Sequence, residues 1–291
     1  MTIHSFYTKD DNCIQITVFY KRNNFLWIGK ISQNNKNIIK ELRKHVYFGE
    51  YEAAFDKFEL KQTTIEGVKC YIPDDCPHFI GQISSSKFIE CDFKFAKHFS
   101  ENYEKKLFDS TSMDSQVKQA LLAFKQFLKK LLIPFYISSG TLLGWYRQCG
   151  VIPYTSDVDT ATWALYASRH LTQQFIHNKT GLKLTFIYGL VENGYQYAFY
   201  SKRRLRLDLF FTYKEGDNLT YTGHTPSKKT YFRYIYPNFT LCSAELVGLK
   251  VLVPCEPIAV IKAGFIAFNK RNSNLFQSIK YFNYRIWWEL V

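Results

Sequence analysis

The sequence has no apolar run as long as the roughly 18 residues that a membrane-spanning helix requires. Residues 1 to 12 also lack a basic stretch followed by an apolar one, the pattern of a secretory signal. In the chain as written we therefore expect neither a signal peptide nor a membrane anchor.

Cysteine-based metal sites are missing too. The seven cysteines include no Cys-x-x-Cys pair and no cluster with histidine, so we expect no zinc site. Their odd number leaves at least one thiol unpaired. We expect free, buried thiols, and we keep open that Cys242 pairs with Cys255, or Cys70 with Cys76, in an oxidising compartment.

Zinc-finger spacing, basic heptad helices and RNA-recognition aromatic motifs are all absent, so nucleic acid is not expected as a partner. The chain nevertheless carries 38 Lys and Arg against 25 Asp and Glu, a net charge of +13. This excess suits an anionic partner such as a nucleotide diphosphate, or reflects a generally basic surface without a dedicated partner. A nucleic-acid-binding protein is the weakest of three functional hypotheses.

With 291 residues, of which 46% are hydrophobic and 18% aromatic, the chain is large enough for one globular domain or two smaller ones. Helical and alternating apolar patterns both occur, which indicates a mixed α/β (α+β) fold. We expect a smaller accessory domain of α/β character at residues 1–108 and a larger domain, which carries the candidate chemistry given below, at 109–291.

The apolar periodicities predict individual elements along the chain. A helix after Asp114 or Ser115 should end before Pro134, with Lys125, Lys129 and Lys130 on its solvated face. His170 and His177 in a later helix have no third ligand at a suitable spacing. We expect a hairpin at 13–31, helices at 34–46, 115–132 and 165–177, short strands within 51–100, strands at 182–190, 195–200 and 205–213, and a mobile loop at 223–229. The aromatic run 231–236 fits the wall of a pocket and a strand against the core equally well.

The segment 136–160 carries the candidate chemistry. A short apolar strand leads into Gly140 and Thr141, which open one or two helical turns, and a second extended segment holds Asp157 and Asp159. Side chains two apart on a strand point the same way, so both carboxylates share one face. Such a pair suits a hard divalent cation, and free N–H groups at a helix start suit phosphate. Alone, an Asp-x-Asp triplet is more often an exposed turn.

The residues GTLLGWYRQCGVIPYTSDVDTA, 140–161, resemble the signature of the LicD/fukutin family, with its G-T-L-L-G, its R-x-x-G-(F/V)-I-P-(W/Y) and its acidic triplet in this order. Residues 79–100 and 240–255 resemble other parts of fukutin-like proteins less specifically. The resemblance implies a nucleotidyltransferase fold of the polymerase-β type, a CDP-activated donor and a Golgi location. The family's Tyr-Gly-x-x-Trp element is replaced here by Ala263-Gly264-Phe265, which puts the substrate pocket in doubt.

The resemblance also implies a third carboxylate on a neighbouring strand, at Asp208, and a functional arginine at Arg147, which would contact phosphate or lock its loop. The alternative for Asp208 is a surface side chain paired with Arg206. Lys202, Arg203, Arg204 and Arg206 form the densest basic cluster, which suits phosphate or an ordinary exposed turn.

These residues lead to one main hypothesis. Asp157, Asp159 and Asp208 would hold Mg²⁺ or Mn²⁺, while Gly140, Thr141, Arg147 and Arg206 would bind substrate. The reaction would move a phosphorylated alcohol, ribitol 5-phosphate by resemblance, from a CDP-alcohol donor to a glycan hydroxyl. The alternative is an inactive member that binds a glycan or a partner.

Overall fold

The computed structural model describes residues 4–9, 12–17, 20–22, 25–27, 54–56, 58, 60–101, 111–177, 180–227 and 230–271. Helices and sheets alternate along the chain, which confirms the expected mixed α/β class. The expected helix at 34–46 and the proposed boundary after residue 108 lie outside the described residues. Within these residues, no helix combines the length and the apolar character of a membrane span.

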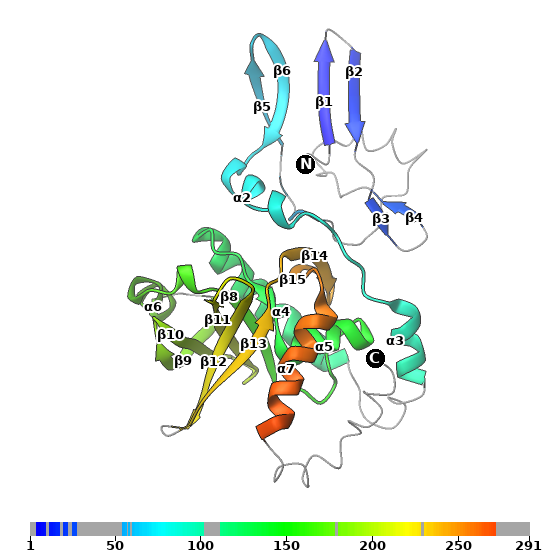
Figure 1. Ribbon diagram of the computed structural model, residues 1–291. Coiled ribbons are helices and arrows are strands. Elements are labelled where there is room, and N and C mark those ends of the chain that lie inside the picture. The colour runs from blue at the N-terminus through cyan, green and yellow to red at the C-terminus, as the bar shows by residue number, and fades with distance from the viewer. Residues whose placement is uncertain are drawn as a thin grey trace.

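The N-terminal part contains a small antiparallel sheet in the order β2-β1-β6-β5 (Figure 1). Its strands are β1 (His4–Lys9), β2 (Asn12–Thr17), β5 (Leu60–Ile65) and β6 (Val68–Pro73). The single hairpin expected at 13–31 is only partly confirmed. Its second half forms the hairpin of β3 (Tyr20–Arg22) and β4 (Phe25–Trp27), whereas β2 pairs with β1, two residues before it in sequence. Closing so short a connection costs little entropy.

Three helical elements lie between residues 76 and 99, where we expected short strands. The elements are α2 (Cys76–Gly81), the 3₁₀ turn η2 (Ile83–Ser85) and α3 (Phe93–Phe99). Asp75 caps α2 by accepting a hydrogen bond from the His78 N–H, and Asp92 caps α3 in the same way at Lys94 and Phe95. The caps satisfy N–H groups that a helix leaves unpaired, and they outweigh the strand preference of the aromatic residues.

The main body is built on a seven-stranded sheet whose continuous order is β13-β12-β11-β10-β9. β8 lies parallel to β11, and β7 pairs antiparallel with β8. The expected strands between residues 182 and 213 are confirmed. The prediction of a mobile loop at 223–229 is wrong for residues 223–227, because these residues belong to β12, which pairs with β13. The strands are β7 (Tyr136–Ile137), β8 (Asp157–Trp163), β9 (Leu182–Leu190), β10 (Asn193–Ser201), β11 (Arg206–Glu215), β12 (Leu219–Ser227) and β13 (Thr230–Pro237).

Helices cover this sheet and complete the core (Figure 1). α4 (Thr111–Lys130) begins four residues before the start we expected, so Asp114 lies in its first turn and Ser115 inside it. It buries Phe124, whose ring packs edge-on against Phe135. α6 (Arg169–Ile176) starts later than predicted, after a cap by the Ser168 side chain. The buried side chains of α4 are Val117, Ala120, Leu121, Phe124 and Leu128.

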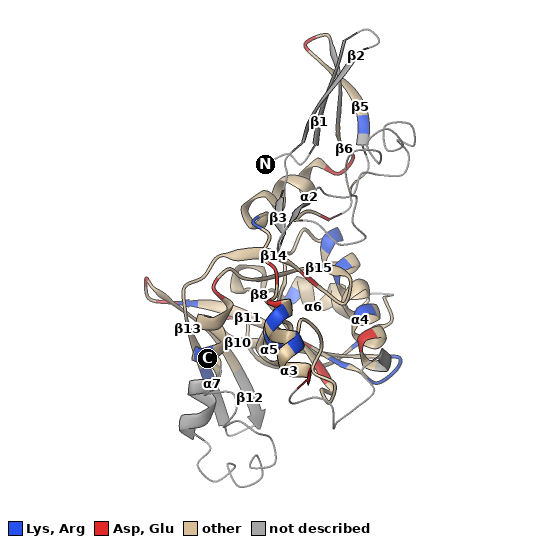
Figure 2. Ribbon diagram, turned by 90° about the vertical axis from the view of Figure 1, so that its right-hand side faces the viewer, with Lys and Arg blue, Asp and Glu red and all other residues tan. Residues whose placement is uncertain are grey.

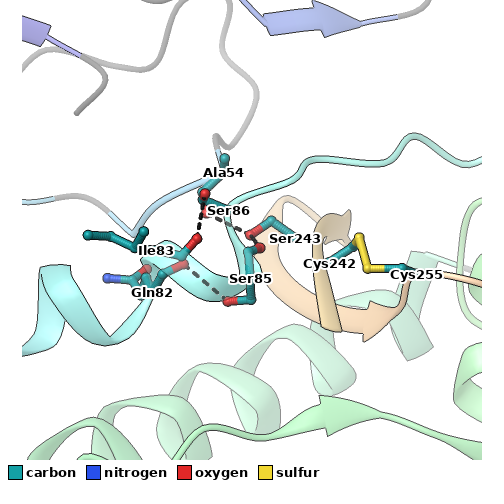
Figure 3. The surroundings of a disulfide bond; sticks show 8 residues. All are labelled: Ala54, Gln82, Ile83, Ser85, Ser86, Cys242, Ser243 and Cys255. Carbon is teal, nitrogen blue, oxygen red and sulfur yellow. Dashed lines mark hydrogen bonds between the residues drawn. A yellow bond between two sulfur atoms is a disulfide. The ribbon is translucent and has the colours of Figure 1, made fainter. Parts of the chain in front are cut away.

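The hairpin of β14 (Leu241–Leu246) and β15 (Leu249–Pro254) joins the N-terminal part to the main body. Ser243 exchanges backbone hydrogen bonds with the segment 87–89. Its hydroxyl lies 2.6 Å from the Ala54 carbonyl oxygen and 2.9 Å from that of Ser85 (Figure 3). Residues far apart in sequence therefore meet at one buried serine.

A buried charge cluster reinforces this junction. Asp56 contacts Lys125 of α4 at 2.5 Å, His78 of α2 at 2.9 Å and Lys250 of β15 at 3.9 Å. Lys250 also donates to the Gln82 side chain at 2.7 Å. Burial alone would raise the pKa of Asp56, but Lys250, His78 and Lys125 together hold it well below its usual value.

The cluster corrects one expectation about α4. Lys125 is not part of a solvated face, because Asp56 and the Lys250 carbonyl oxygen both bind its ammonium group. Lys130 is exposed, as expected. Other lysines and arginines are spread over both parts of the chain, including β5 and α4 (Figure 2).

Two disulfides replace the free thiols that we expected. Cys242–Cys255 closes the β14–β15 hairpin, which confirms one of the alternatives (Figure 3). Cys91–Cys149 joins the segment before α3 to the end of α5 (Ser139–Gln148). Cys76 carries a free thiol, so it is not paired with Cys70. The pair Cys91–Cys149 spans 58 residues, and no spacing rule indicates it from the sequence.

Candidate metal centre

Two parallel strands bring three carboxylates together. Asp157 and Asp159 lie on β8, and their side chains share a face because strand side chains alternate. Val158, between them, is buried on the other face. The parallel register sets Asp208 of β11 directly beside Asp159. One carboxylate oxygen from each of the three lies within 4.8 Å of the others.

The start of α5 holds Asp159 in place. The Gly140 N–H donates to Asp159 Oδ2 at 3.0 Å, and the Asp159 N–H donates to the Thr141 hydroxyl at 2.8 Å. The Ser138 N–H donates to the Asp159 carbonyl oxygen at 3.1 Å. A β-carbon added at Gly140 would lie 3.4 Å from Asp159 Oδ2, so the helix start and the carboxylate are in close contact. The sequence places Gly140 and Thr141 near the acids, and the structure shows that both bind one of them.

Two threonines and an arginine orient the other acids. The Thr155 hydroxyl donates to Asp157 Oδ1 at 3.0 Å, and the Thr160 hydroxyl donates to the Asp208 carbonyl oxygen at 2.7 Å. Arg206 Nε donates to Asp208 Oδ1 at 2.9 Å. Asp208 is therefore paired with Arg206, as our alternative stated, but it is buried and not at the surface.

The cluster is short of positive charge. Burial and the negative charges of Asp157 and Asp208 raise the pKa of Asp159 to about 8. Burial also raises the pKa of Asp208 to about 6, although Arg206 opposes this rise. Three acids and one arginine leave a net negative charge in a partly buried place. A divalent cation would supply the missing positive charge and keep all three acids ionised.

Arg147 is the one predicted site residue that the structure does not bring to the acids. It lies at the far end of α5 from Gly140, about 10 Å along the helix axis. Its guanidinium lies over the Phe99 ring at 4.5 Å and donates to the Gln148 side chain. Gln148 in turn donates to the Val151 carbonyl oxygen at 2.9 Å. Of the two roles we considered, these contacts match the locking of the loop before β8.

Two polar groups at the centre were not singled out from the sequence. Thr155 orients Asp157, and its position two residues before the acid is the signal that would have indicated it. The Ser138 side-chain oxygen is buried and has no hydrogen-bond partner among the residues that the structure describes, next to the helix start that contacts Asp159. An unpartnered hydroxyl at this place is available to a substrate oxygen.

The donor set fits a hard cation. Three carboxylates without sulfur or imidazole favour Mg²⁺ or Mn²⁺ over zinc or copper. We searched the described part of the chain for three or more His, Cys, Asp or Glu side chains that could share one metal ion. The search finds these three acids. His170 and His177 do not join them.

Comparison with known proteins agrees with this geometry. The family model described as Fukutin N-terminal matches residues 1–118, and the one described as LicD/FKTN/FKRP, nucleotidyltransferase domain, matches residues 132–256. Ribitol-5-phosphate transferase FKTN of Homo sapiens is 36% identical over 258 residues, and that of Mus musculus is 37% identical over 262 residues. Each alignment covers 87% of this chain and 55% of the relative.

An uncharacterized protein of Caenorhabditis elegans is 26% identical over 193 residues, covering 64% of this chain and 48% of its own. The chain thus spans about half the length of the curated relatives that it matches. The two family models together cover most of the sequence, and the three carboxylates of the cluster lie within the residues that the second model matches. The chain therefore belongs to the LicD/fukutin family.

Proposed function

We propose that the protein is a metal-dependent transferase that moves a phosphorylated alcohol from a CDP-activated donor to a glycan hydroxyl. The observation that carries this proposal is the convergence of Asp157, Asp159 and Asp208 on one point beside the start of α5. Two acids on one strand and a third on its parallel neighbour are the arrangement expected of a polymerase-β type nucleotidyltransferase fold.

In this proposal the three acids hold Mg²⁺ or Mn²⁺. A cation held by them would neutralise charge on the donor diphosphate and on the departing CMP. Gly140 and Thr141 let the backbone come close to that diphosphate, and Arg206 provides a cationic contact. Asp208 accepts the proton of the acceptor hydroxyl, because Arg206 at 2.9 Å stabilises the charged form that a general base needs.

The names of the mammalian relatives favour ribitol 5-phosphate as the transferred group. CDP-ribitol is then the proposed donor and a glycan of a glycoprotein the proposed acceptor, with the Golgi as the compartment. Donors carrying choline or glycerol remain to be compared with it directly. The experiment is a screen of CDP-alcohols with Mg²⁺ or Mn²⁺ in which release of CMP is measured.

Substitution of the acids tests the proposal. Asp157→Asn and Asp159→Asn should each abolish CMP release while leaving the fold intact, because each removes a charged ligand but keeps the shape of the side chain. Asp217→Asn, in the exposed β11–β12 turn, is the matched control and should keep full activity. Unchanged turnover in either site variant would contradict the proposed metal centre.

A second candidate function is a glycan- or partner-binding module without turnover. The observation that favours it is the sequence at 263–265, where the family's Tyr-Gly-x-x-Trp element is altered. These residues lie within α7 (Pro257–Arg271), whose Gly264 packs against the ring of Tyr236. Metal-dependent binding of CDP without turnover of any CDP-alcohol would favour this candidate.

A further inference from the structure

The turn between β10 and β11 presents three cations in succession, Lys202, Arg203 and Arg204, and all three are exposed. The turn has a defined shape. The Ser201 N–H donates to the Leu205 carbonyl oxygen at 2.9 Å, and the Arg204 N–H donates to that of Ser201 at 3.0 Å. The Leu205 N–H donates to the Ser201 hydroxyl at 3.1 Å.

This turn lies beside the carboxylates. β11 leaves the turn at Arg206, which is registered with Asp157, and the Arg206 N–H points to the Ser156 carbonyl oxygen at 3.5 Å. Asp208 is the fourth residue after Arg204, so their α-carbons lie no more than about 14 Å apart. Long cationic side chains on the turn therefore start within reach of any ligand that extends beyond the acids.

The described part of the chain places no opposite charge in contact with these three cations. Among the described residues, no carboxylate forms an ion pair with Lys202, Arg203 or Arg204, whereas Arg206 two residues later is paired with Asp208. Adjacent like charges repel each other, and an anion placed among them relieves the repulsion. Arginine also binds phosphate oxygens through two parallel hydrogen bonds.

We propose that Lys202, Arg203 and Arg204 form a phosphate-binding rim, which receives a phosphate group of a substrate at the edge of the metal centre. The assignment of that phosphate to a substrate rests on the proposed function. Two sources share this chemistry, the diphosphate of the donor and an anionic group on the acceptor. The cation held by the three acids and the rim would then bind different parts of the reacting pair.

The first experiment measures binding of inorganic phosphate in the presence of EDTA, so that no metal contributes. The triple variant Lys202→Ala, Arg203→Ala, Arg204→Ala should bind phosphate at least about tenfold more weakly than the unmodified protein, because charge-assisted hydrogen bonds are lost. The control removes the same charge elsewhere, at the exposed Lys94, Lys130 and Lys214. It should bind phosphate normally. Equal weakening in both triple variants, or no phosphate binding by the unmodified protein, would overturn the proposal.

Arg204→Gly separates binding from folding. Arg204 has a φ of 64°, which glycine adopts without strain, so this variant removes a charge at no structural cost. We expect its thermal stability to be unchanged or higher and its phosphate affinity to fall. Full phosphate affinity in Arg204→Gly would exclude Arg204 from the rim.

Measuring the binding of CDP in the presence of Mg²⁺ then identifies which substrate supplies the phosphate that the rim binds. If the rim holds the donor diphosphate, the Lys202, Arg203, Arg204 triple variant loses CDP affinity; if it holds the acceptor, CDP affinity is retained. Failure of the proposed function has a different signature. In that case Asp157→Asn leaves Mg²⁺-dependent CDP binding unchanged, while phosphate binding in EDTA still depends on the rim.

Discussion

The surroundings of Asp159 suit metal binding but make its ionised form unfavourable in the metal-free protein. Its carboxylate accepts a hydrogen bond from Gly140, yet it lies beside two other acids, and these charges together with burial raise its pKa to about 8. Above this pH the folded protein must keep an unfavourable negative charge. Sites that bind metals commonly carry such repulsion in the metal-free state.

The raised pKa predicts how stability depends on pH. Between the usual value near 4 and about 8, the folded state holds a proton on Asp159 that the unfolded state has lost, so metal-free stability should fall as pH rises through this window. Asp159→Asn should flatten the decrease and be more stable at pH 8 by on the order of 1 to 3 kcal/mol. Denaturation in EDTA at pH 5 and pH 8 measures this. Identical pH profiles for both proteins would contradict the prediction.

The close contacts around Gly144 lead to a second prediction about a single residue. An added β-carbon would lie 2.8 Å from the Gly150 carbonyl oxygen and 3.1 Å from Ile152 Cγ1. Gly144→Ala should therefore destabilise the protein by about 1 to 3 kcal/mol, although alanine normally favours a helix. Thermal unfolding measures the effect.

Gly81→Ala is the control for Gly144→Ala. Gly81 ends a helix with no atom near its added β-carbon, so its substitution should change stability by less than about 1 kcal/mol. A gain of stability in Gly144→Ala would show that the loop before β8 is not held as closely as the structure indicates.

Among the elements, β8, β11 and α5 decide the site. β8 and β11 were predicted as extended segments, and the family resemblance implied that they are neighbours. The sequence contains no signal of the parallel register that sets Asp159 next to Asp208. α5 is longer than the one or two turns expected, since Gly144 allows it to pack against the following loop. Arg147 is consequently carried away from the acids.

The two disulfides are expected to stabilise the protein to different degrees. Cys91–Cys149 spans 58 residues and Cys242–Cys255 spans 13. Removing the first with alanine at both positions should cost about 4 kcal/mol, and removing the second about 3 kcal/mol, because the longer loop gains more entropy when unfolded. Urea denaturation of the two double variants measures both losses. A larger loss for the hairpin disulfide would show that loop length does not decide the order of the two losses.

At the scale of the whole molecule, residues 54–101 and the main body share one junction. Lys250 is 4% exposed, and its ammonium contacts Gln82 and Asp56 from the N-terminal part. Ser243 likewise gives its hydroxyl to carbonyl oxygens of that part. The sequence regions on either side of our proposed boundary near residue 108 are therefore joined by hydrogen bonds and ion pairs between their buried polar groups.

This junction predicts the behaviour of a truncated chain. The fragment 109–291 would leave Lys250 without Asp56 and Gln82, and Cys149 without Cys91. A buried charge that loses its partner costs on the order of 3 to 5 kcal/mol, in addition to the loss of the disulfide. We expect the fragment to melt well below the full chain, and Lys250→Met in the fragment to recover part of the loss. Calorimetry of the three proteins measures this. A fragment as stable as the full chain would show that the catalytic part folds independently.

The sequence by itself determined the family motif, the mixed α/β class, the paired carboxylates of Asp157 and Asp159, and most strands of the main sheet. Each of these depends on residues close together in the chain, where side-chain alternation and turn chemistry act locally. The tertiary structure alone decided the distance of Arg147 from the acids, the disulfide Cys91–Cys149, and the burial of Lys125 and Lys250 around Asp56. These depend on contacts between distant segments, which form because buried charges and hydrogen-bonding groups need partners that local sequence does not provide.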